Sequence, residues 1–437
     1  MAQVLTNPPT EAPQVDARGT ARHIESLFRA PGWVHSDVYT SQNIFDLEME
    51  RIFHRGWLYL GHETEIPQPG DFRLRMMGRY PVIFVRGSDN VVRVLMNRCR
   101  HRGTIVCEKN SGQAQQFRCA YHGWTYDTTG KLSHVEQPGG YADLDKEKMG
   151  LIPARVDDYR GFVFASLEKS GKPLPEHLGR AMAQIDTVVD ASPTGRIAVD
   201  YGAHKTKFLG NWKLVGMDGY HPNTLHASVW QIIKRGSDKP YRDPYSDDAN
   251  TVTRHLDNGH VMLDLTGQRL DHLDEHLVRL ASVQGGPEYI DDMRKAFGRE
   301  RADLLLAIAG DPHMGIFPNL QLIGGHIRVI SPVGPAETRV DMFPIRMLDV
   351  SDEINEWRLR QHEFSYGPAG YVSPDDAEIF ERVQRGMSAA AEPWLDLSRG
   401  LHRQSTDADG STVARMTDEL TQRAQLEAWK SMMTDVH

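Results

Sequence analysis

Two short segments of the chain each place one cysteine close to one histidine. Cys99 and His101 are separated by one residue, Cys119 and His122 by two, and seventeen residues lie between the two pairs. Thiolates and imidazoles are metal ligands, so the four side chains could hold either a zinc ion or a [2Fe–2S] cluster. Zinc fingers group two cysteines and then two histidines, whereas each pair here mixes the two types. The order therefore favours the cluster, with zinc as the alternative.

A [2Fe–2S] cluster with two cysteines on one iron and two histidines on the other is a Rieske centre. Imidazole ligation raises its reduction potential, so that it can accept an electron from a low-potential ferredoxin. Cys107 falls outside the ligand spacing and is expected to be a small buried apolar side chain. Trp124 is expected either to cover the edge of the cluster or to be an ordinary core tryptophan.

A second group of candidate ligands lies downstream, where His221 and His226 are five residues apart. On a straight α-helix this separation would turn the two side chains about 140° away from each other. Gly219 and Pro222 disfavour a regular helix, which predicts a distorted turn that brings both imidazoles together. Two histidines and one carboxylate form the facial triad of non-haem Fe(II) oxygenases. In a chain with twenty histidines the spacing alone does not establish iron binding.

The motifs Cys99-Arg100-His101-Arg102-Gly103 and Cys119-Ala120-Tyr121-His122-Gly123-Trp124 together resemble the Rieske domain of the large subunit of bacterial ring-hydroxylating oxygenases. The resemblance implies a second, mononuclear iron elsewhere in the chain. It also implies a catalytic domain of the helix-grip, START-like type, in which helices flank an antiparallel sheet.

The downstream histidines match the Asp-x2-His-x4-His pattern of that family, beginning at Asp218. By the same match, the segment 367–376 supplies the third iron ligand, Asp376, to join His221 and His226. The alternative for this segment is a helix start that Asp375 caps.

The resemblance gives Asp218 a role in electron transfer rather than in binding iron. It implies that Asp218 and His221 of one subunit contact His122 of the next, which requires a ring of at least three chains. The alternative is a carboxylate that orients His221 within its own chain. Relatives often carry Glu-Asn a few residues before this aspartate, whereas residues 214–217 here read Leu-Val-Gly-Met, so no role of an amide at that site transfers.

The arrangement of strand-like and helix-like patterns predicts an α+β chain in four parts. They are a mobile arm (1–21), a helical segment packed on the catalytic domain (22–56), an all-β Rieske domain (57–170) and a catalytic iron domain (171–437). Within the Rieske domain, residues 81–85 and 91–95 predict a hairpin, and residues 161–165 predict the strand that closes the domain. Within the catalytic domain, periodicity predicts helices over 287–309, 352–364 and 418–433, the last two capped by Ser351 and Thr417, and strands over 316–348.

Composition excludes several classes of protein. A net charge of -9 argues against a nucleic-acid partner, and no apolar run is long enough for a membrane span. Three cysteines cannot form a disulfide framework in 437 residues, and the first twenty residues lack the features of a signal peptide, so the cytoplasm is expected.

The resemblance implies the terminal oxygenase component of a multicomponent dioxygenase. NADH would supply electrons through a reductase and ferredoxin, and O2 would convert an aromatic ring to a cis-dihydrodiol. No Gly-rich nucleotide motif follows a strand, so the reductase is expected to be a separate polypeptide. A homotrimer or α3β3 assembly with a small beta subunit is implied. A Rieske electron carrier or a binding protein would need only the chain up to about Ser170, and the long remainder argues against both.

Arg328 is the residue that bears on substrate identity. It aligns with an arginine that holds a carboxylate in aromatic-acid members of the family, and guanidinium suits bidentate carboxylate binding. The alternative is a strand arginine paired with Asp or Glu. A benzoate-like acid is therefore predicted, with a neutral hydrocarbon, biaryl or aryl ether, or mono-oxygenation and O- or N-demethylation, as alternatives. The predicted apolar walls of the pocket are Leu214, Met217, Phe317, Tyr366 and Val372.

Overall fold

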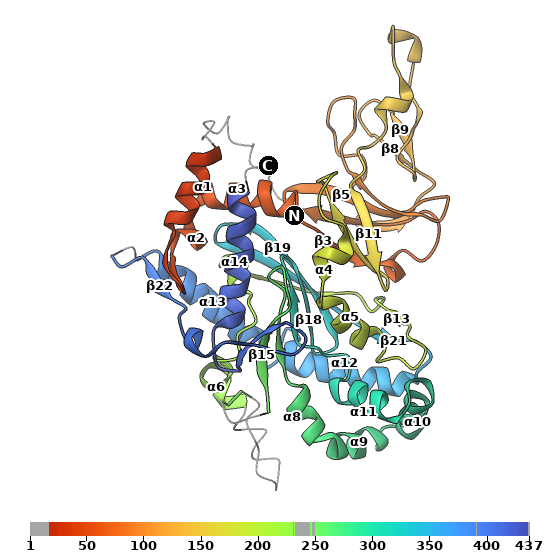
Figure 1. The fold of residues 1–437 in the computed structure, drawn as a ribbon. Helices are drawn as coiled ribbons and strands as arrows, with labels where there is room; N and C mark the ends of the chain where they lie inside the picture. The colour runs from red at the N-terminus through yellow and green to blue at the C-terminus, as the bar shows by residue number, and fades with distance from the viewer. Residues whose placement is uncertain (1–16, 230, 232–244, 247–249, 390, 436–437) are drawn as a thin grey trace.

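The structure is a computed structural model, and it describes residues 17–229, 231, 245–246, 250–389 and 391–435. Figure 1 shows a small β module, coloured orange to yellow, standing at one end of a larger body in which helices surround a long sheet. The predicted α+β class is therefore confirmed. No helix in the described ranges has the length and apolar character needed to cross a bilayer.

The N-terminal segment is mostly helical and lies against the large body (Figure 1). Its first helix begins at Ala17, five residues before residue 22, where the sequence predicts that the ordered chain begins; Thr20 in this first part is buried, and the helix lies against the C-terminal helix. The remainder of the predicted arm, residues 1–16, lies outside the described residues. The elements are α1 (Ala17–Ser26), β1 (Phe28–Ala30), β2 (Trp33–His35), α2 (Asp37–Thr40), α3 (Gln42–Glu48) and the π-helical turn η1 (Met49–Phe53).

The β module consists of three small antiparallel sheets, ordered β6-β5-β4-β7, β10-β9-β8 and β11-β12-β3. The predicted hairpin is present as β5 and β6, and the predicted closing strand is β12, which pairs with β3. The strands are β3 (Leu58–His62), β4 (Asp71–Met77), β5 (Tyr80–Arg86), β6 (Val92–Met96), β7 (Ser111–Gln113), β8 (Gln116–Arg118), β9 (Thr125–Asp127), β10 (Leu132–His134), β11 (Arg155–Tyr159) and β12 (Phe162–Ser166). Short 3-10 turns are η2 (Glu63–Glu65), η3 (Pro138–Gly140) and η4 (Lys146–Met149).

The large body is built on a nine-stranded antiparallel sheet, ordered β14-β20-β19-β18-β17-β16-β15-β24-β23. Its strands are β14 (His204–Phe208), β15 (Val252–His255), β16 (Val261–Asp264), β17 (Met314–Ile316), β18 (Leu320–Ile323), β19 (His326–Gly334), β20 (Glu337–Pro344), β23 (Ser405–Thr406) and β24 (Thr412–Arg415). Two short strands, β13 (Ile197–Ala198) and β21 (Arg346–Met347), pair with each other, and β22 (Trp394–Asp396) joins the N-terminal β2.

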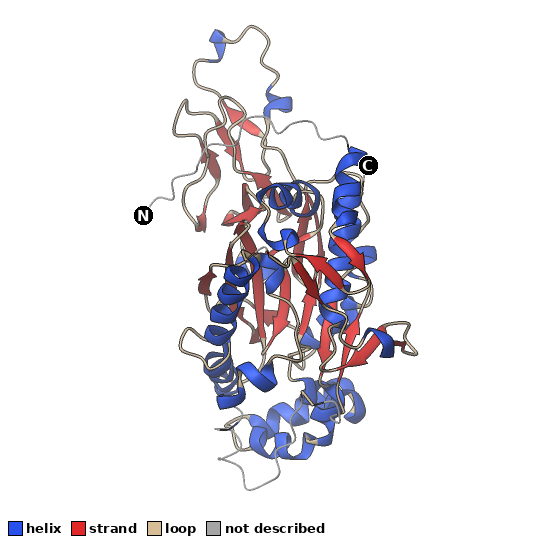
Figure 2. Cartoon of the chain, turned by 90° about the vertical axis from the view of Figure 1, so that its left-hand side faces the viewer, coloured by secondary structure: helices blue, strands red, loops and turns tan. Residues whose placement is uncertain are grey.

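Helices flank this sheet on both sides, as Figure 2 shows. The predicted helix over 287–309 is two helices, because Gly298 adopts a left-handed φ of 73° and breaks it. The last helix begins at Leu420 without the predicted side-chain cap from Thr417, whereas Ser351 does cap its helix by accepting a hydrogen bond from the Ile354 N–H. The helices are α4 (Leu174–Leu178), α5 (Ala181–Val189), η5 (Trp212–Leu214), α6 (Pro222–Leu225), α8 (Thr266–Asp271), α9 (Leu273–Ala281), α10 (Gly286–Phe297), α11 (Arg299–Ile308), α12 (Asp352–Tyr366), α13 (Ser373–Met387), η6 (Leu401–Arg403) and α14 (Leu420–Thr434).

The two faces of the sheet have different neighbours, since strand side chains alternate. Leu322 and Ile327 face the core formed with α4 and α5. On the opposite face, Ile330 and Met342 pack with α13 and α14. Arg328 lies two residues before Ile330 and therefore on the face that α13 and α14 cover, where the predicted iron ligand Asp376 also lies.

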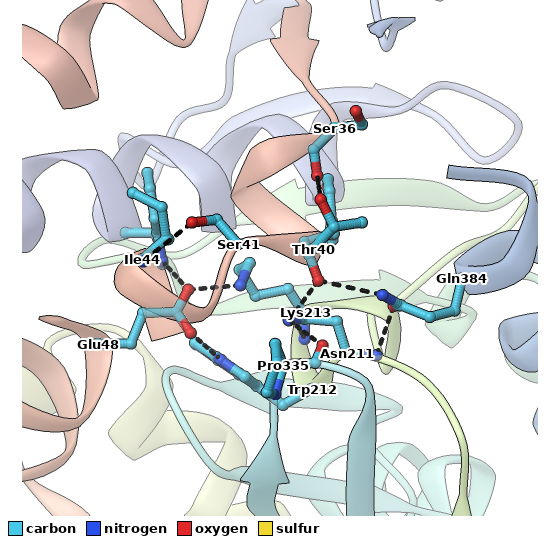
Figure 3. A network of polar contacts seen from close by, with 12 residues as sticks. Ser36, Thr40, Ser41, Ile44, Glu48, Asn211, Trp212, Lys213, Pro335 and Gln384 are labelled. Carbon is cyan, nitrogen blue, oxygen red and sulfur yellow. Dashed lines mark hydrogen bonds and ion pairs between the residues drawn. The ribbon is translucent and has the colours of Figure 1, made fainter. Parts of the chain in front are cut away.

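A buried polar network fixes the N-terminal segment onto this body (Figure 3). The Glu48 carboxylate is fully buried and accepts hydrogen bonds from the indole N–H groups of Trp212 (2.8 Å) and Trp429 (2.7 Å). It also forms an ion pair with Lys213. The network thus ties α3 to α14 and to η5, the turn that directly precedes the segment containing Asp218 and His221.

Candidate metal centres and substrate cavity

The two Cys–His loops of the β module have the same backbone design. In the first, the Cys99 N–H donates to the Thr104 carbonyl and the Gly103 N–H to the Cys99 carbonyl. In the second, the Cys119 N–H donates to the Trp124 carbonyl and the Gly123 N–H to the Cys119 carbonyl. The two glycines have φ of 78° and 70°, a left-handed conformation that residues with a Cβ rarely adopt. Two matching turns therefore present the four predicted cluster ligands.

The cysteines and histidines of these loops differ in exposure. Cys99 and Cys119 are 3% and 2% exposed, whereas His101 and His122 border an open hollow of about 650 Å³, with their ring centroids 4.4 Å apart. Trp124 is buried and stacks on His101 with an interplanar angle of 8°. This arrangement fits a [2Fe–2S] cluster whose cysteine-bound iron is buried and whose histidine-bound iron lies near the surface.

A hydroxyl group also contacts the buried side of this site. The Tyr126 Oη lies 3.3 Å from the Cys99 Sγ and accepts a hydrogen bond from the Arg100 N–H at 2.9 Å. Burial is the main reason that the pKa of Tyr126 is raised, so its hydroxyl stays protonated and can donate to sulfur. Hydrogen bonds to the ligand sulfurs are among the features that set the reduction potential of such clusters.

The predicted iron ligands converge in the large body. His221 and His226 stand at the two ends of α6, a single helical turn with Pro222 at its first position. The Asp376 Oδ1 lies 3.3 Å from the His221 Nε2 and 3.1 Å from the His226 Nε2, and one ligand atom from each residue lies within 4.8 Å of the others. Two imidazoles and a carboxylate at this spacing fit a facial Fe(II) site with open coordination positions.

Each of these imidazoles has a second carboxylate on its other nitrogen. The His221 Nδ1 lies 3.2 Å from the Asp218 Oδ2, and the His226 Nδ1 lies 3.5 Å from the Asp375 Oδ2. The alternative interpretation required Asp375 to cap its helix. It does not, because α13 has no side-chain cap. Carboxylates in this position fix the tautomer of a metal-binding histidine, leaving Nε2 free for the metal.

The electrostatics of the site favour a cation. Burial alone would lower the pKa of His221, but Asp218 and Asp376 raise it to about 9. Burial would likewise raise the pKa of Asp376, but the two imidazoles lower it to about 2. The carboxylates thus stay ionised around the imidazoles, a donor set suited to a divalent metal.

Two protein-family models match the chain, and their ranges include the residues of both sites. The model of the Rieske [2Fe-2S] domain matches residues 56–146, and that of the ring hydroxylating alpha subunit catalytic domain matches residues 196–425. The chain is an alpha subunit of the ring-hydroxylating dioxygenase family. It is therefore an oxidoreductase that uses a Rieske cluster and mononuclear iron, and the family works with reductase or ferredoxin partners on aromatic substrates.

This alpha subunit is similar to several named dioxygenases. It is 32% identical over 390 residues to the 2-halobenzoate 1,2-dioxygenase large subunit of Burkholderia cepacia, covering 83% of this chain and 79% of the relative. It is 33% identical to the anthranilate 1,2-dioxygenase large subunit of Acinetobacter baylyi (84% and 80% covered) and 31% identical to the biphenyl dioxygenase subunit alpha of Paraburkholderia xenovorans (92% and 91%). Naphthalene 1,2-dioxygenase from Rhodococcus has the same fold, with a TM-score of 0.78, 25% identity and 95% and 98% coverage.

A cavity of about 170 Å³ adjoins the iron-site residues of the alpha subunit. Met217, Tyr366 and Val372 line it, as the sequence predicts. Leu214 and Phe317 do not: Leu214 ends the 3-10 turn η5 and packs against the main core, and Phe317 packs there beside Trp212. Apolar lining residues that sequence reasoning missed include Val215, Val229, Leu263, Ile323, Phe364 and Phe380.

Arg328 lines the same cavity and is only 8% exposed. Its Nε donates to the His326 Nε2 at 3.0 Å, its Nη2 lies 3.5 Å from the Ser373 Oγ, and its guanidinium stacks over the Tyr366 ring at 4.7 Å. Within the described part of the chain no carboxylate lies within 4.0 Å of it, so the predicted alternative of a strand ion pair is not observed. A buried cation that forms no ion pair with any described residue therefore faces the cavity.

Proposed function

We propose that this alpha subunit cis-dihydroxylates an aromatic acid and that its metal ligands are those predicted from the sequence. Support comes from the matching loops of the β module and from the convergence of two imidazoles and one carboxylate beside a cavity. The cluster ligands are Cys99, His101, Cys119 and His122, and the iron ligands are His221, His226 and Asp376.

When bound, the cluster supplies electrons and the mononuclear iron supplies O2 activation. The chain's own residues prepare that reaction. Asp218 and Asp375 hold the two imidazoles with Nε2 turned inward, and the apolar walls exclude water from the ring. Arg328 binds and orients the substrate carboxylate in the cavity.

The single observation that carries the substrate assignment is the buried guanidinium of Arg328, which forms no ion pair within 4.0 Å among the described residues. Burial lowers the pKa of Arg328, yet an arginine stays charged in proteins, and a buried charge is costly unless it is paired. A substrate carboxylate would supply the missing anion through bidentate hydrogen bonds. Two of the named relatives, the 2-halobenzoate and anthranilate enzymes, act on aromatic acids, which supports the same assignment.

Two buried histidines orient this arginine. His326 accepts from the Arg328 Nε through Nε2, so its Nδ1 carries the proton and donates to the His362 Nδ1 at 2.9 Å. Both imidazoles are neutral, because burial holds the pKa of His326 well below its usual value and that of His362 at about 4. With Nε fixed in this way, the Nη groups remain available to the cavity.

Substitution of Arg328 tests the assignment. We expect Arg328→Gln to raise the KM for benzoate at least about tenfold, since a charged hydrogen-bonded pair is lost, while benzene turnover changes little. Arg328→Lys should retain part of the affinity. Unchanged benzoate kinetics in Arg328→Gln would exclude the acid assignment and favour a neutral aromatic substrate, as in the biphenyl enzyme. Mass spectrometry of the product formed under labelled O2 separates dihydroxylation, with two labelled atoms, from mono-oxygenation or demethylation.

We also infer that electrons pass between subunits, from His122 of one chain to Asp218 and His221 of the next. His122 lies at the exposed edge of its module, next to the exposed Tyr121, and Asp218 is one-third exposed while it contacts His221. Co-expression of a Cys119→Ser chain with a His226→Ala chain tests this. Mixed oligomers should recover activity that neither variant has alone; no recovery would place both centres of each working pair in one chain.

A further inference from the structure

Gln321 is a polar residue of the cavity to which neither the sequence nor the comparisons give a role. It lies on β18 directly opposite Arg328 on β19, and directly opposite Gly315 on β17. Residues opposed in this way project from the same face of a sheet, with about 5 Å between neighbouring strands. Gln321 and Arg328 therefore lie side by side on the cavity face, and both line the cavity.

One hydrogen bond fixes the orientation of the Gln321 amide. Its Nε2 donates to the Val215 carbonyl at 2.8 Å. A backbone carbonyl can only accept, so the atom facing it must be the amide nitrogen, and the oxygen must be the other end of the group. The hydrogen bond to Val215 thus determines which end of the amide is Nε2 and which is Oε1.

The Gln321 Oε1 is left without a partner. The side chain is 2% exposed, and its oxygen has no hydrogen bond among the described residues. Arg328 does not donate to it, since its Nε and Nη2 are directed to His326 and Ser373. Nearly all buried acceptors in proteins are satisfied, and this exception calls for a donor that the described residues do not supply.

We propose that the Gln321 Oε1 accepts a hydrogen bond from the substrate, and that the substrate is a benzoate with an amino or hydroxyl group on the ring carbon next to the carboxylate. The inference rests on the proposed binding of the carboxylate by Arg328. The guanidinium and the amide belong to adjacent strands, which lie about 5 Å apart, so two groups on neighbouring ring carbons suit them better than groups on opposite sides of the ring. Gln321 lines the cavity beside Arg328, so a ligand held by the guanidinium lies next to the amide.

Binding measurements on the metal-loaded, oxidised enzyme under anaerobic conditions test this without turnover. Titration calorimetry would compare 2-aminobenzoate with 2-chlorobenzoate, which have ring substituents of similar size but differ in hydrogen-bond donation. We expect 2-aminobenzoate to bind about fivefold to tenfold more tightly, the value of one buried hydrogen bond. The 4-amino and 4-chloro isomers should differ by less than about twofold.

Two variants identify the residue responsible. Gln321→Met keeps the length of the side chain and should reduce the preference for 2-aminobenzoate to near one. Ile323→Val, on the same strand and the same cavity wall, should change the affinity for both 2-substituted acids alike and keep the preference. If Gln321→Met does not fold, the ligand series on the unmodified enzyme still decides.

Equal affinity for the two 2-substituted acids, or a preference that survives in Gln321→Met, would overturn the inference. A preference that appears only for the 4-substituted pair would also overturn it. Failure of the underlying function looks different: in that case Arg328→Gln would leave the affinity for all these acids unchanged, whatever their second substituent.

Discussion

Cys119 of the β module and His226 of the catalytic body are each 2% exposed, yet the two predicted metal centres have different surroundings. The cluster site opens outward, with His101 and His122 along a hollow of about 650 Å³. At the iron site His226 is buried, carboxylates lie behind both histidines and a cavity of about 170 Å³ adjoins them, although His221 and Asp218 stay partly exposed.

This contrast follows from what each centre must exchange with its surroundings. A centre that receives electrons needs one edge close to the surface, so that a partner protein can approach it. A centre that activates O2 needs space for a ring and protection from water. The chain accordingly presents the proposed cluster ligands on two hydrogen-bonded turns, and carries the proposed iron ligands on α13 and at the two ends of α6.

If the two centres are independent, removing one metal should leave the other in place. We expect Asp376→Ala to lose the mononuclear iron and to lower activity at least about a hundredfold, since even indirect partners of metal ligands contribute tenfold or more. The visible absorption of the cluster should stay unchanged. Cys119→Ser should do the reverse, abolishing the cluster spectrum while one iron per chain remains. Loss of both metals in either variant would contradict the comparison.

The stability of the catalytic body should depend on its contacts with the N-terminal segment more strongly than the stability of the β module does. Glu48→Leu leaves Lys213 buried without its carboxylate, and breaking a buried ion pair costs about 3–5 kcal/mol. We expect denaturant unfolding of the catalytic body at a lower concentration, with weaker iron retention and an intact cluster spectrum. Glu50→Leu, at an exposed position two residues away, is the matched control and should change stability by less than about 0.5 kcal/mol.

The carboxylates behind the histidines should strengthen iron binding without touching the cluster. Asp375→Asn removes the charge beside the His226 Nδ1, and changes of this kind weaken metal binding by about 10–100-fold. Competition with a chelator, followed by iron analysis, measures the effect. Asp157→Asn, an exposed change on β11, serves as the control. An unaltered iron affinity in Asp375→Asn would show that its contact with His226 contributes nothing.

The smallest expected effect is a change in the reduction potential of the cluster, with no change at the iron site. Tyr126→Phe removes a hydroxyl that lies 3.3 Å from the Cys99 Sγ. A hydrogen bond of about 1 kcal/mol corresponds to roughly 40 mV for a one-electron couple, so the reduction potential should fall by a few tens of millivolts. Protein-film voltammetry measures this shift, and the iron content should stay constant. A potential equal to that of the unmodified enzyme would exclude the hydrogen bond.

Local patterns were sufficient to predict residues whose function depends on nearby sequence. The Cys–His pairs are adjacent in sequence because one turn carries each pair, and Ser351 caps α12 because capping is local. The break at Gly298 was missed, since the apolar periodicity continues across it.

Residues whose function depends on strand pairing could not be predicted in this way. Gln321 could be recognised as a cavity residue only from the strand pairing, which places it opposite Arg328. Once that pairing is known, the alternation of side chains along β18 puts Gln321 on the cavity face. Leu214 was wrongly assigned to the cavity because the 3-10 turn that ends there directs it to the core. Closeness to a ligand in sequence was therefore a poor guide to the cavity walls.

The one-turn helix α6 gives the iron site an unusual sensitivity to chain length. Four residues, Pro222–Leu225, separate the two histidines, so the distance between them is counted along a single turn. One inserted residue would rotate an imidazole by about 100° and push it along the axis by about 1.5 Å. Relatives that share this chemistry should therefore vary in the length of the loops around α6 but hardly ever in the length of α6 itself. The turn thus sets the distance between the two histidines that would bind the metal.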